Sequence, residues 1–104
     1  YFDHTAIIAS YNAGIRDFGE NRVLDAVAKI ELIDDEIRQN SRFHLIGHLQ
    51  KNKVKKAVGN FDLIQSVDTL ELAQAIDAEA VKKEIKQKVL ILPMLLHCIL
   101  PILL

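Results

Sequence analysis

Residues 43–59 constrain the fold of this chain more than any other stretch. They open with a short apolar run, 43–46, and Gly47 then permits a sharp turn or a close backbone approach. After a polar stretch, Gly59 stands where a left-handed helix C-cap is expected. Between the two glycines, apolar residues recur at the i, i+3, i+4 spacing of one helix face: Val54, Ala57 and Val58. The stretch therefore predicts a strand, a glycine turn and a helix, which is most of a parallel βα unit.

The same alternation of apolar runs and amphipathic stretches recurs along the chain. Strands are expected at 15–18, 43–46, 61–66 and 88–92, with Gly19 as the break after the first. Because a parallel crossover needs a dozen or more residues, these intervals fit successive βαβ units. We therefore predict an α/β fold whose strands are parallel neighbours in chain order. The runner-up is a small doubly wound sheet, which would carry helices on both faces.

Polar residues indicate where the helices begin. Asp3 or Thr5 can cap a first helix, and Asn21 is most simply the N-cap of the next one. Asp68 and Glu71 are spaced as a capping-box-like pair before a long helix. The inner face of that long helix is expected to contain Leu72, Ala73, Ile76, Ala80 and Val81.

Composition and charge limit the function classes. With 104 residues the chain forms one domain at most, and a net charge of −1 gives no basic excess for nucleic acid or an acidic membrane. One cysteine, Cys98, excludes an intrachain disulfide framework and suits a reducing compartment, so we expect a cytoplasmic location. No residue set has zinc spacing, and no Walker loop or nucleophile elbow is present.

The stretch 89–104 is almost wholly apolar and is broken by Pro93, His97 and Pro101. A membrane-spanning helix needs roughly 20 residues, and this stretch has sixteen. We expect a buried strand followed by a poorly specified end. A membrane anchor is the minority alternative.

Three polar residues follow or end successive predicted strands: Asn21, His48 and Ser66. A parallel sheet brings such positions to one edge, where ligands gather, so we expect them to converge on one site. Asn21 also has a simpler interpretation as a helix cap, and His48 as a structural hydrogen-bonding residue. Lys51 and Lys53 lie near enough to the turn to meet an anion, although a basic run is usually a solvated helix face.

Taken together, three motifs are much more specific. Residues 11–23 read YNAGIRDFGENRV, residues 43–53 read FHLIGHLQKNK, and residues 61–68 read FDLIQSVD. The first resembles the A-G-x-x-x-F-G-E-N-x-V segment of the YggS-type pyridoxal phosphate homeostasis proteins, also called PROSC. The second resembles the W-H-F-I-G-x-L-Q-x-N-K signature of that family, and the third is similar to its next strand. The resemblance covers roughly residues 5–91.

This resemblance implies a (β/α)8 barrel of the alanine racemase N-terminal domain type. The family binds pyridoxal 5′-phosphate (PLP) as a Schiff base to a lysine at the end of the first barrel strand. It has no established catalytic turnover, and its role is to hold the cofactor and keep vitamin B6 pools in balance. By the same resemblance, the cofactor-binding residues here are Asn21, His48 and Ser66.

The sequence departs from the family pattern at both ends. The family's first strand, with the Schiff-base lysine, would precede the first helix, and Lys51, Lys53 and Lys88 follow or begin other strands. The late strands that hold the phosphate are missing as well, and an apolar run replaces the expected polar continuation. We therefore expect a fragment with a partial PLP-binding barrel domain at 1–91 and an apolar, divergent tail at 92–104.

A (β/α)8 barrel needs about 200 residues or more, so about four strands would form an open half-barrel with unpaired edges. We expect impaired cofactor binding, no stable Schiff base with PLP, and self-association through the exposed sheet edges. Two alternatives from other classes stay open. One is a PLP-dependent enzyme of the alanine racemase type, which would need the lysine and an opposing acid–base residue. The other is a half-barrel interaction module without a cofactor.

Overall fold

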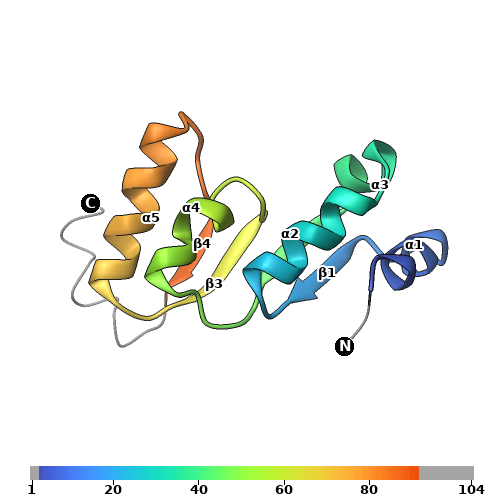
Figure 1. Ribbon diagram of the computed structural model, residues 1–104, viewed down its shortest axis with the longest axis horizontal. Helices are drawn as coiled ribbons and strands as arrows, with labels where there is room; N and C mark the ends of the chain where they lie inside the picture. The colour runs from blue at the N-terminus through green and yellow to red at the C-terminus, as the bar shows by residue number, and fades with distance from the viewer. Residues whose placement is uncertain (1–2, 92–104) are drawn as a thin grey trace.

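The computed structural model describes residues 3–91, so the apolar tail and its membrane-anchor alternative lie outside the described residues. Its centre is one four-stranded sheet in the order β1-β2-β3-β4 (Figure 1). Every neighbouring pair in the sheet is parallel, which confirms the predicted α/β class and strand order. The strands are β1 (Asp17–Glu20), β2 (Arg42–Leu45), β3 (Leu63–Val67) and β4 (Val89–Ile91).

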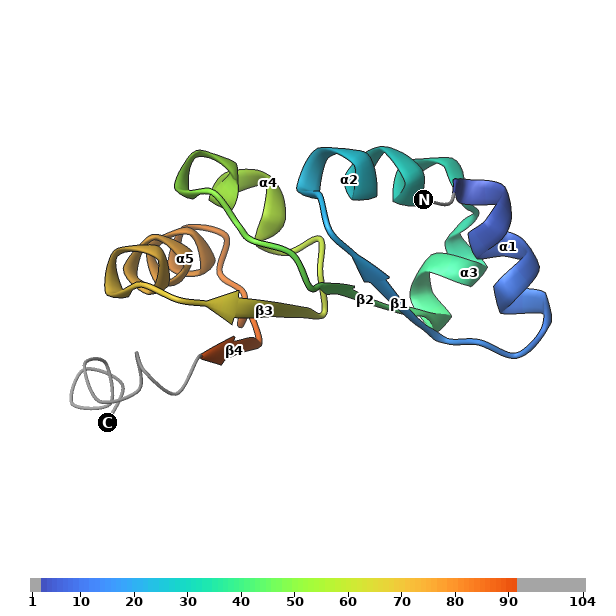
Figure 2. The ribbon, with the colours of Figure 1, turned by 90° about the horizontal axis from the view of Figure 1, so that it is seen from below.

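Helices cover one face of this sheet. Figure 2 shows α2, α4 and α5 side by side over that face, with α1 and α3 beyond the β1 end. In the described part of the chain no helix lies on the other face, so the predicted partial barrel is confirmed and the doubly wound runner-up is wrong. None of the helices within residues 3–91 is long and apolar enough to cross a membrane. They are α1 (His4–Asn12), α2 (Val23–Leu32), α3 (Asp35–Asn40), the 3-10 turn η1 (Lys51–Lys53), α4 (Val54–Ala57) and α5 (Leu70–Lys82).

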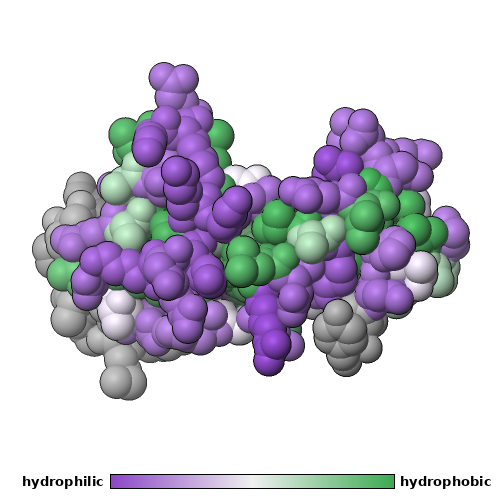
Figure 3. Space-filling view, in the orientation of Figure 1, coloured by the Kyte–Doolittle hydropathy of each residue, from purple (hydrophilic) through white to green (hydrophobic). Residues whose placement is uncertain are grey.

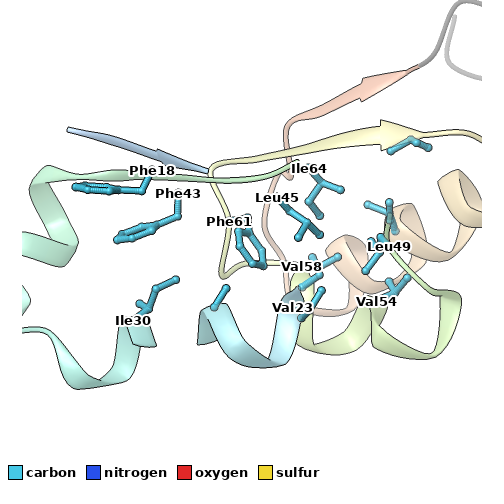
Figure 4. Packing of buried hydrophobic residues seen from close by; sticks show 14 of the residues in the cluster. Phe18, Val23, Ile30, Phe43, Leu45, Leu49, Val54, Val58, Phe61 and Ile64 are labelled. Carbon is cyan, nitrogen blue, oxygen red and sulfur yellow. The ribbon is translucent and has the colours of Figure 1, made fainter. Parts of the chain in front are cut away.

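The core lies between the sheet and its helices (Figure 4). Successive side chains of a strand point to opposite faces, and Phe18 of β1 and Phe43 of β2 both point to the helices and are buried. Their rings stack with centroids 5.5 Å apart. Burying such a side chain contributes about 2 kcal/mol. The apolar positions that predicted a helix after Gly47 are buried here as well: Val54, Ala57 and Val58. Val23 and Ile30 of α2 are also buried.

The opposite face of the sheet carries a polar cluster at the amino ends of β1 and β2. Arg42 Nε and Nη2 each donate to the Asp17 carboxylate over 2.7 Å, and His44 Nε2 lies 3.0 Å from Asp17 Oδ1. The hydrogen bonds from Arg42 and then His44 hold the pKa of the Asp17 carboxyl well below its usual range. Since Asp17 and Arg42 are partners in register, the cluster ties the first two strands together on the helix-free face.

The first strand begins and ends later than predicted. Ile15 donates its backbone N–H to Ser10 O at 3.0 Å, so it closes the end of α1 instead of joining the sheet. Gly19, expected to break the strand, lies inside β1. Its missing side chain leaves space for Ile46, because a Cβ on Gly19 would lie 3.1 Å from Ile46 Cδ1. Pairing with the neighbouring strand therefore overrides the low strand preference of glycine.

Two predicted helix caps are wrong. The N-cap of α2 is Arg22, which makes no side-chain cap hydrogen bond, so Asn21 does not cap this helix. The N-cap of α5 is Thr69, whose hydroxyl accepts a hydrogen bond from the Leu72 N–H at 3.1 Å, so Asp68 does not form the predicted capping box. In both places the chain enters the helix one residue later than the sequence pattern indicated.

Other local predictions had mixed outcomes. Asp3 caps α1 by accepting from the N–H of Thr5, and Gly59 follows α4 with a φ of 92°, so both predictions are confirmed. Val81 was placed on the inner face of α5 but is 69% exposed, because it lies at the flank of that helix. The short helix α3 was not predicted, since Ile37 is its one buried residue and leaves no apolar period to detect.

Candidate functional site

The loops that follow β1 and β2 are in close contact at the carboxyl edge of the sheet. The Ile46 N–H donates to Glu20 O at 2.8 Å, which extends the parallel ladder by one residue beyond the end of β2. Gly47 then passes so close to Asn21 that a Cβ on Gly47 would lie 2.3 Å from Asn21 O. Only glycine fits there without displacing backbone, and the contact places His48 beside Asn21.

Asn21 and His48 line one hollow of about 620 Å³, so the structure brings these two predicted site residues together. His48 is largely exposed, with 66% of its side chain accessible. The hollow lies between the loop after β2 and the start of α2. Its remaining lining residues are Arg22, Val23, Leu24, Asp25, Gly47, Gln50 and Lys53.

The backbone places the third predicted residue, Ser66, next to the last position of β3 at the same edge of the sheet. His48 also lines a smaller hollow of about 210 Å³, which reaches Asp68 and Thr69 after β3. His48 Nδ1 lies 3.7 Å from Asp68 Oδ2, so the imidazole bridges the loops that follow β2 and β3.

The larger hollow borders the N-terminus of α2. Because Arg22 caps this helix without a side-chain hydrogen bond, the first N–H groups of α2 have no partner within the helix. Arg22 and Lys53 bring positive charge to the lining, against the carboxylate of Asp25. An anionic group would be stabilised there by the helix dipole and these cations. The sequence analysis named Lys53 as a residue that could meet an anion, but it did not name Arg22. The available signal was that Arg22 directly precedes the apolar, helix-spaced residues of α2.

Lys51, the other lysine considered for an anion, has a different neighbour. Its ammonium pairs with Glu71 at the start of α5, and their hydrogen bond lowers the pKa of the Glu71 carboxyl. Both side chains line the smaller hollow, and both are mostly exposed. The pair therefore links η1 to α5, and Lys53 is the lysine that lines the larger hollow.

A buried ion pair lies behind the site. Glu20, the last residue of β1, is 5% exposed, and Lys29 of α2 donates from Nζ to its carboxylate at 2.5 and 3.0 Å. The pair joins the end of the strand to the middle of the helix, and the loop that carries Asn21 lies between them. Sequence reasoning did not identify this pair, because its two residues are separated by a turn whose geometry the sequence does not specify. Within residues 3–91, no group of three or more acidic, cysteine or histidine side chains could hold a metal ion.

No family model matches the sequence, but known proteins are similar to it. The chain is 48% identical over 71 residues to a pyridoxal phosphate homeostasis protein of Synechocystis, which is 68% of this chain and 32% of the relative. It is 43% identical over 81 residues to the protein of that name from Aquifex aeolicus, or 78% of this chain and 34% of the relative. The structure is similar to PipY of Synechococcus elongatus, solved with PLP bound. The TM-score is 0.82 and the identity 37%, over 97% of this chain and 51% of PipY.

The chain is a relative of the pyridoxal phosphate homeostasis proteins. The family resemblance inferred from the three motifs is thereby confirmed, and so is the partial barrel, because the described strands and helices match about half of PipY. The chain spans about a third of the length of the curated pyridoxal phosphate homeostasis proteins it matches.

Proposed function

We propose that this chain contributes to pyridoxal 5′-phosphate binding and homeostasis. The observation that carries the proposal is the close passage of Gly47 along Asn21. It puts an amide and an imidazole on one hollow at the carboxyl edge of a parallel sheet. Ligands gather at this edge in parallel α/β folds, and the similar PipY structure was solved with PLP bound.

The chemistry of the hollow suits such a ligand. Its volume of about 620 Å³ lies in the range of about 300–1,000 Å³ that is usual for small-molecule sites. The proposed roles are hydrogen bonding by Asn21, hydrogen bonding or ring stacking by His48, and a further donor from Ser66 at the neighbouring strand end. Arg22, Lys53 and the N–H groups of the first turn of α2 would attract the negative charge of the ligand.

When bound, PLP supplies an aldehyde that reacts with amines, and this chain's residues bind and orient it. Their contribution is proposed to be noncovalent. Lys53 lies on a turn after β2, whereas the family motif places its lysine at the end of an earlier strand. We propose a carrier role without turnover, because relatives of the chain are named homeostasis proteins. If the chain were part of a PLP-dependent enzyme, turnover would be observed. If it were an interaction module without a cofactor, adding PLP would leave its spectra unchanged.

The proposal includes a cytoplasmic location, which the single cysteine supports. It also includes self-association, because β1 and β4 are the outer strands of the described sheet. Apolar side chains are exposed near both: Ile15 is 49% and Leu90 53% accessible. Sedimentation velocity over a range of concentrations tests this part. A monomer at all concentrations would overturn it.

The binding proposal is tested by titrating the chain with PLP while recording amide NMR spectra. We expect the largest shifts at Asn21 and His48, and weaker binding in the His48→Ala variant. The matched control is His4→Ala, which removes an imidazole from α1, away from the site. Equal affinity of the two variants, or shifts scattered over the whole surface, would refute the site.

Borohydride reduction followed by mass spectrometry tests the noncovalent role. We expect scattered, substoichiometric labelling of lysines, because an amine forms a defined adduct only where the site activates it, and the role proposed for these residues is noncovalent. One stoichiometric adduct at Lys53 would show that this amine anchors the cofactor, which contradicts the noncovalent assignment but leaves the hollow as the site.

A further inference from the structure

An apolar groove of about 490 Å³ runs along the outer flank of α5, on the β4 side. Figure 3 shows hydrophobic side chains beside the hydrophilic ridge of α5. Val81 and Ile85, which line this groove, are 69% and 40% exposed, although both are large aliphatic residues. Exposed apolar surface of this kind is costly unless another segment covers it. The other apolar lining residues are Val67, Leu70, Ala73, Ile76, Ala80, Val89 and Ile91.

The topology indicates which segment would cover the groove. Each of the first three strands is followed by a segment that packs over the same face of the sheet, beside the previous one. α4 contacts α2 on one side and α5 on the other. The segment that follows β4 would take the next place in this row, which is the outer flank of α5. Ile91, the last described residue of β4, itself lines the groove, so the chain leaves the sheet at its rim.

The sequence after Ile91 has the composition that the groove requires. Residues 92–104 include no charged residue, and all but Pro93, His97 and Pro101 are hydrophobic. The segment has 13 residues, the same number as α5, so in length it can run along the whole helix. Moving such apolar side chains from water onto an aliphatic surface is favourable through the hydrophobic effect.

We propose that residues 92–104 bind the groove between α5 and β4 of their own chain. This occupant accounts for the apolar character of Val81 and Ile85, which the described part of the chain leaves uncovered. In this arrangement the apolar tail would pack next to α5, in the position that follows α2, α4 and α5 over the same face of the sheet. A second copy of the chain is the competing occupant, and the test separates the two.

Cys98 is the one cysteine of the chain, and it lies inside the proposed segment. A second cysteine is introduced at a polar, exposed lining position, in the Asp77→Cys or the Gln74→Cys variant. Because a disulfide requires Cα atoms about 4.4–6.8 Å apart, diamide oxidation joins the two thiols only if the tail lies in the groove. The matched control is Glu36→Cys, an exposed acidic position on α3, far from the groove.

We expect an intramolecular disulfide in at least one of the two groove variants and none in the control. Its yield should stay constant on about tenfold dilution, since tethered thiols meet at a high effective concentration. The Val81→Asp substitution should lower this yield severalfold. Leu32→Asp, at a similarly exposed aliphatic residue outside the groove, should not change it. A disulfide that joins two chains, a yield that falls on dilution, or no disulfide in either groove variant would overturn the proposal.

Discussion

Replacing Gly47 by alanine is the sharpest test of how the site is built. The added Cβ would lie 2.3 Å from Asn21 O and 3.0 Å from Asn21 C and Cα. All three atoms belong to backbone, so no side-chain rotation relieves the contact. The φ angle of Gly47 is not positive, so alanine itself suits the conformation and the cost is steric.

The size of the effect follows from this distance. An ordinary carbon contact is about 3.5 Å, so one loop must move by about 1 Å relative to the other. Overpacking of this kind typically costs 1–3 kcal/mol, and we expect a loss of about 2 kcal/mol in the free energy of unfolding. For a domain of about 100 residues this lowers Tm by about 10 °C. The displacement should also separate Asn21 from His48 and weaken PLP binding.

Urea denaturation followed by far-UV circular dichroism measures the stability, and amide NMR shifts report the two loops. Gly19→Ala is the matched control, because its Cβ would meet the flexible end of the Ile46 side chain at 3.1 Å, which can move away. We expect the control to lose much less stability and to keep the Asn21 and His48 signals. If Gly47→Ala is as stable as the parent with unchanged signals, the close contact does not exist and the reasoning fails.

Three further predictions concern individual contacts. Removing the α5 cap with Thr69→Ala should cost about 1 kcal/mol of unfolding free energy by urea denaturation. Lys29→Met should destabilise by about 3 kcal/mol in the same assay, because it leaves the Glu20 carboxylate buried without this partner. Arg42 depresses the pKa of Asp17, so the stability from this pair is present above about pH 4 and is lost as the pH falls below that. In Asp17→Asn this acid-dependent loss, read from the urea midpoint against pH, should be smaller.

Matched variants decide each of these outcomes. Asp68→Ala should leave the stability of α5 almost unchanged, and a loss equal to that of Thr69→Ala would restore the predicted capping box. The double variant Glu20→Met with Lys29→Met should recover most of the loss, since no charge is then left buried. If Asp17→Asn retains the full acid dependence, other carboxylates cause it.

Much of the fold could be predicted from local patterns. The spacing of apolar runs predicted four parallel strands in chain order, because a crossover of a dozen residues or more excludes hairpins and favours helices between strands. The cap at Asp3 and the left-handed glycine at Gly59 were predicted for the same reason, since each depends on a few consecutive residues. The motif resemblance predicted the barrel type, which periodicity alone left open against a doubly wound sheet.

The tertiary structure alone decided which groups meet at the site. The cap of α2 is Arg22 and not Asn21, because the ladder that pairs β1 with β2 carries the chain one residue further before the helix begins. The contact of Gly47 with Asn21 joins two loops that are far apart in sequence, and no local preference specifies it. Periodicity in the sequence determines which face of each element is buried. The register between elements determines which backbones touch, and therefore that Asn21 and His48 share one hollow.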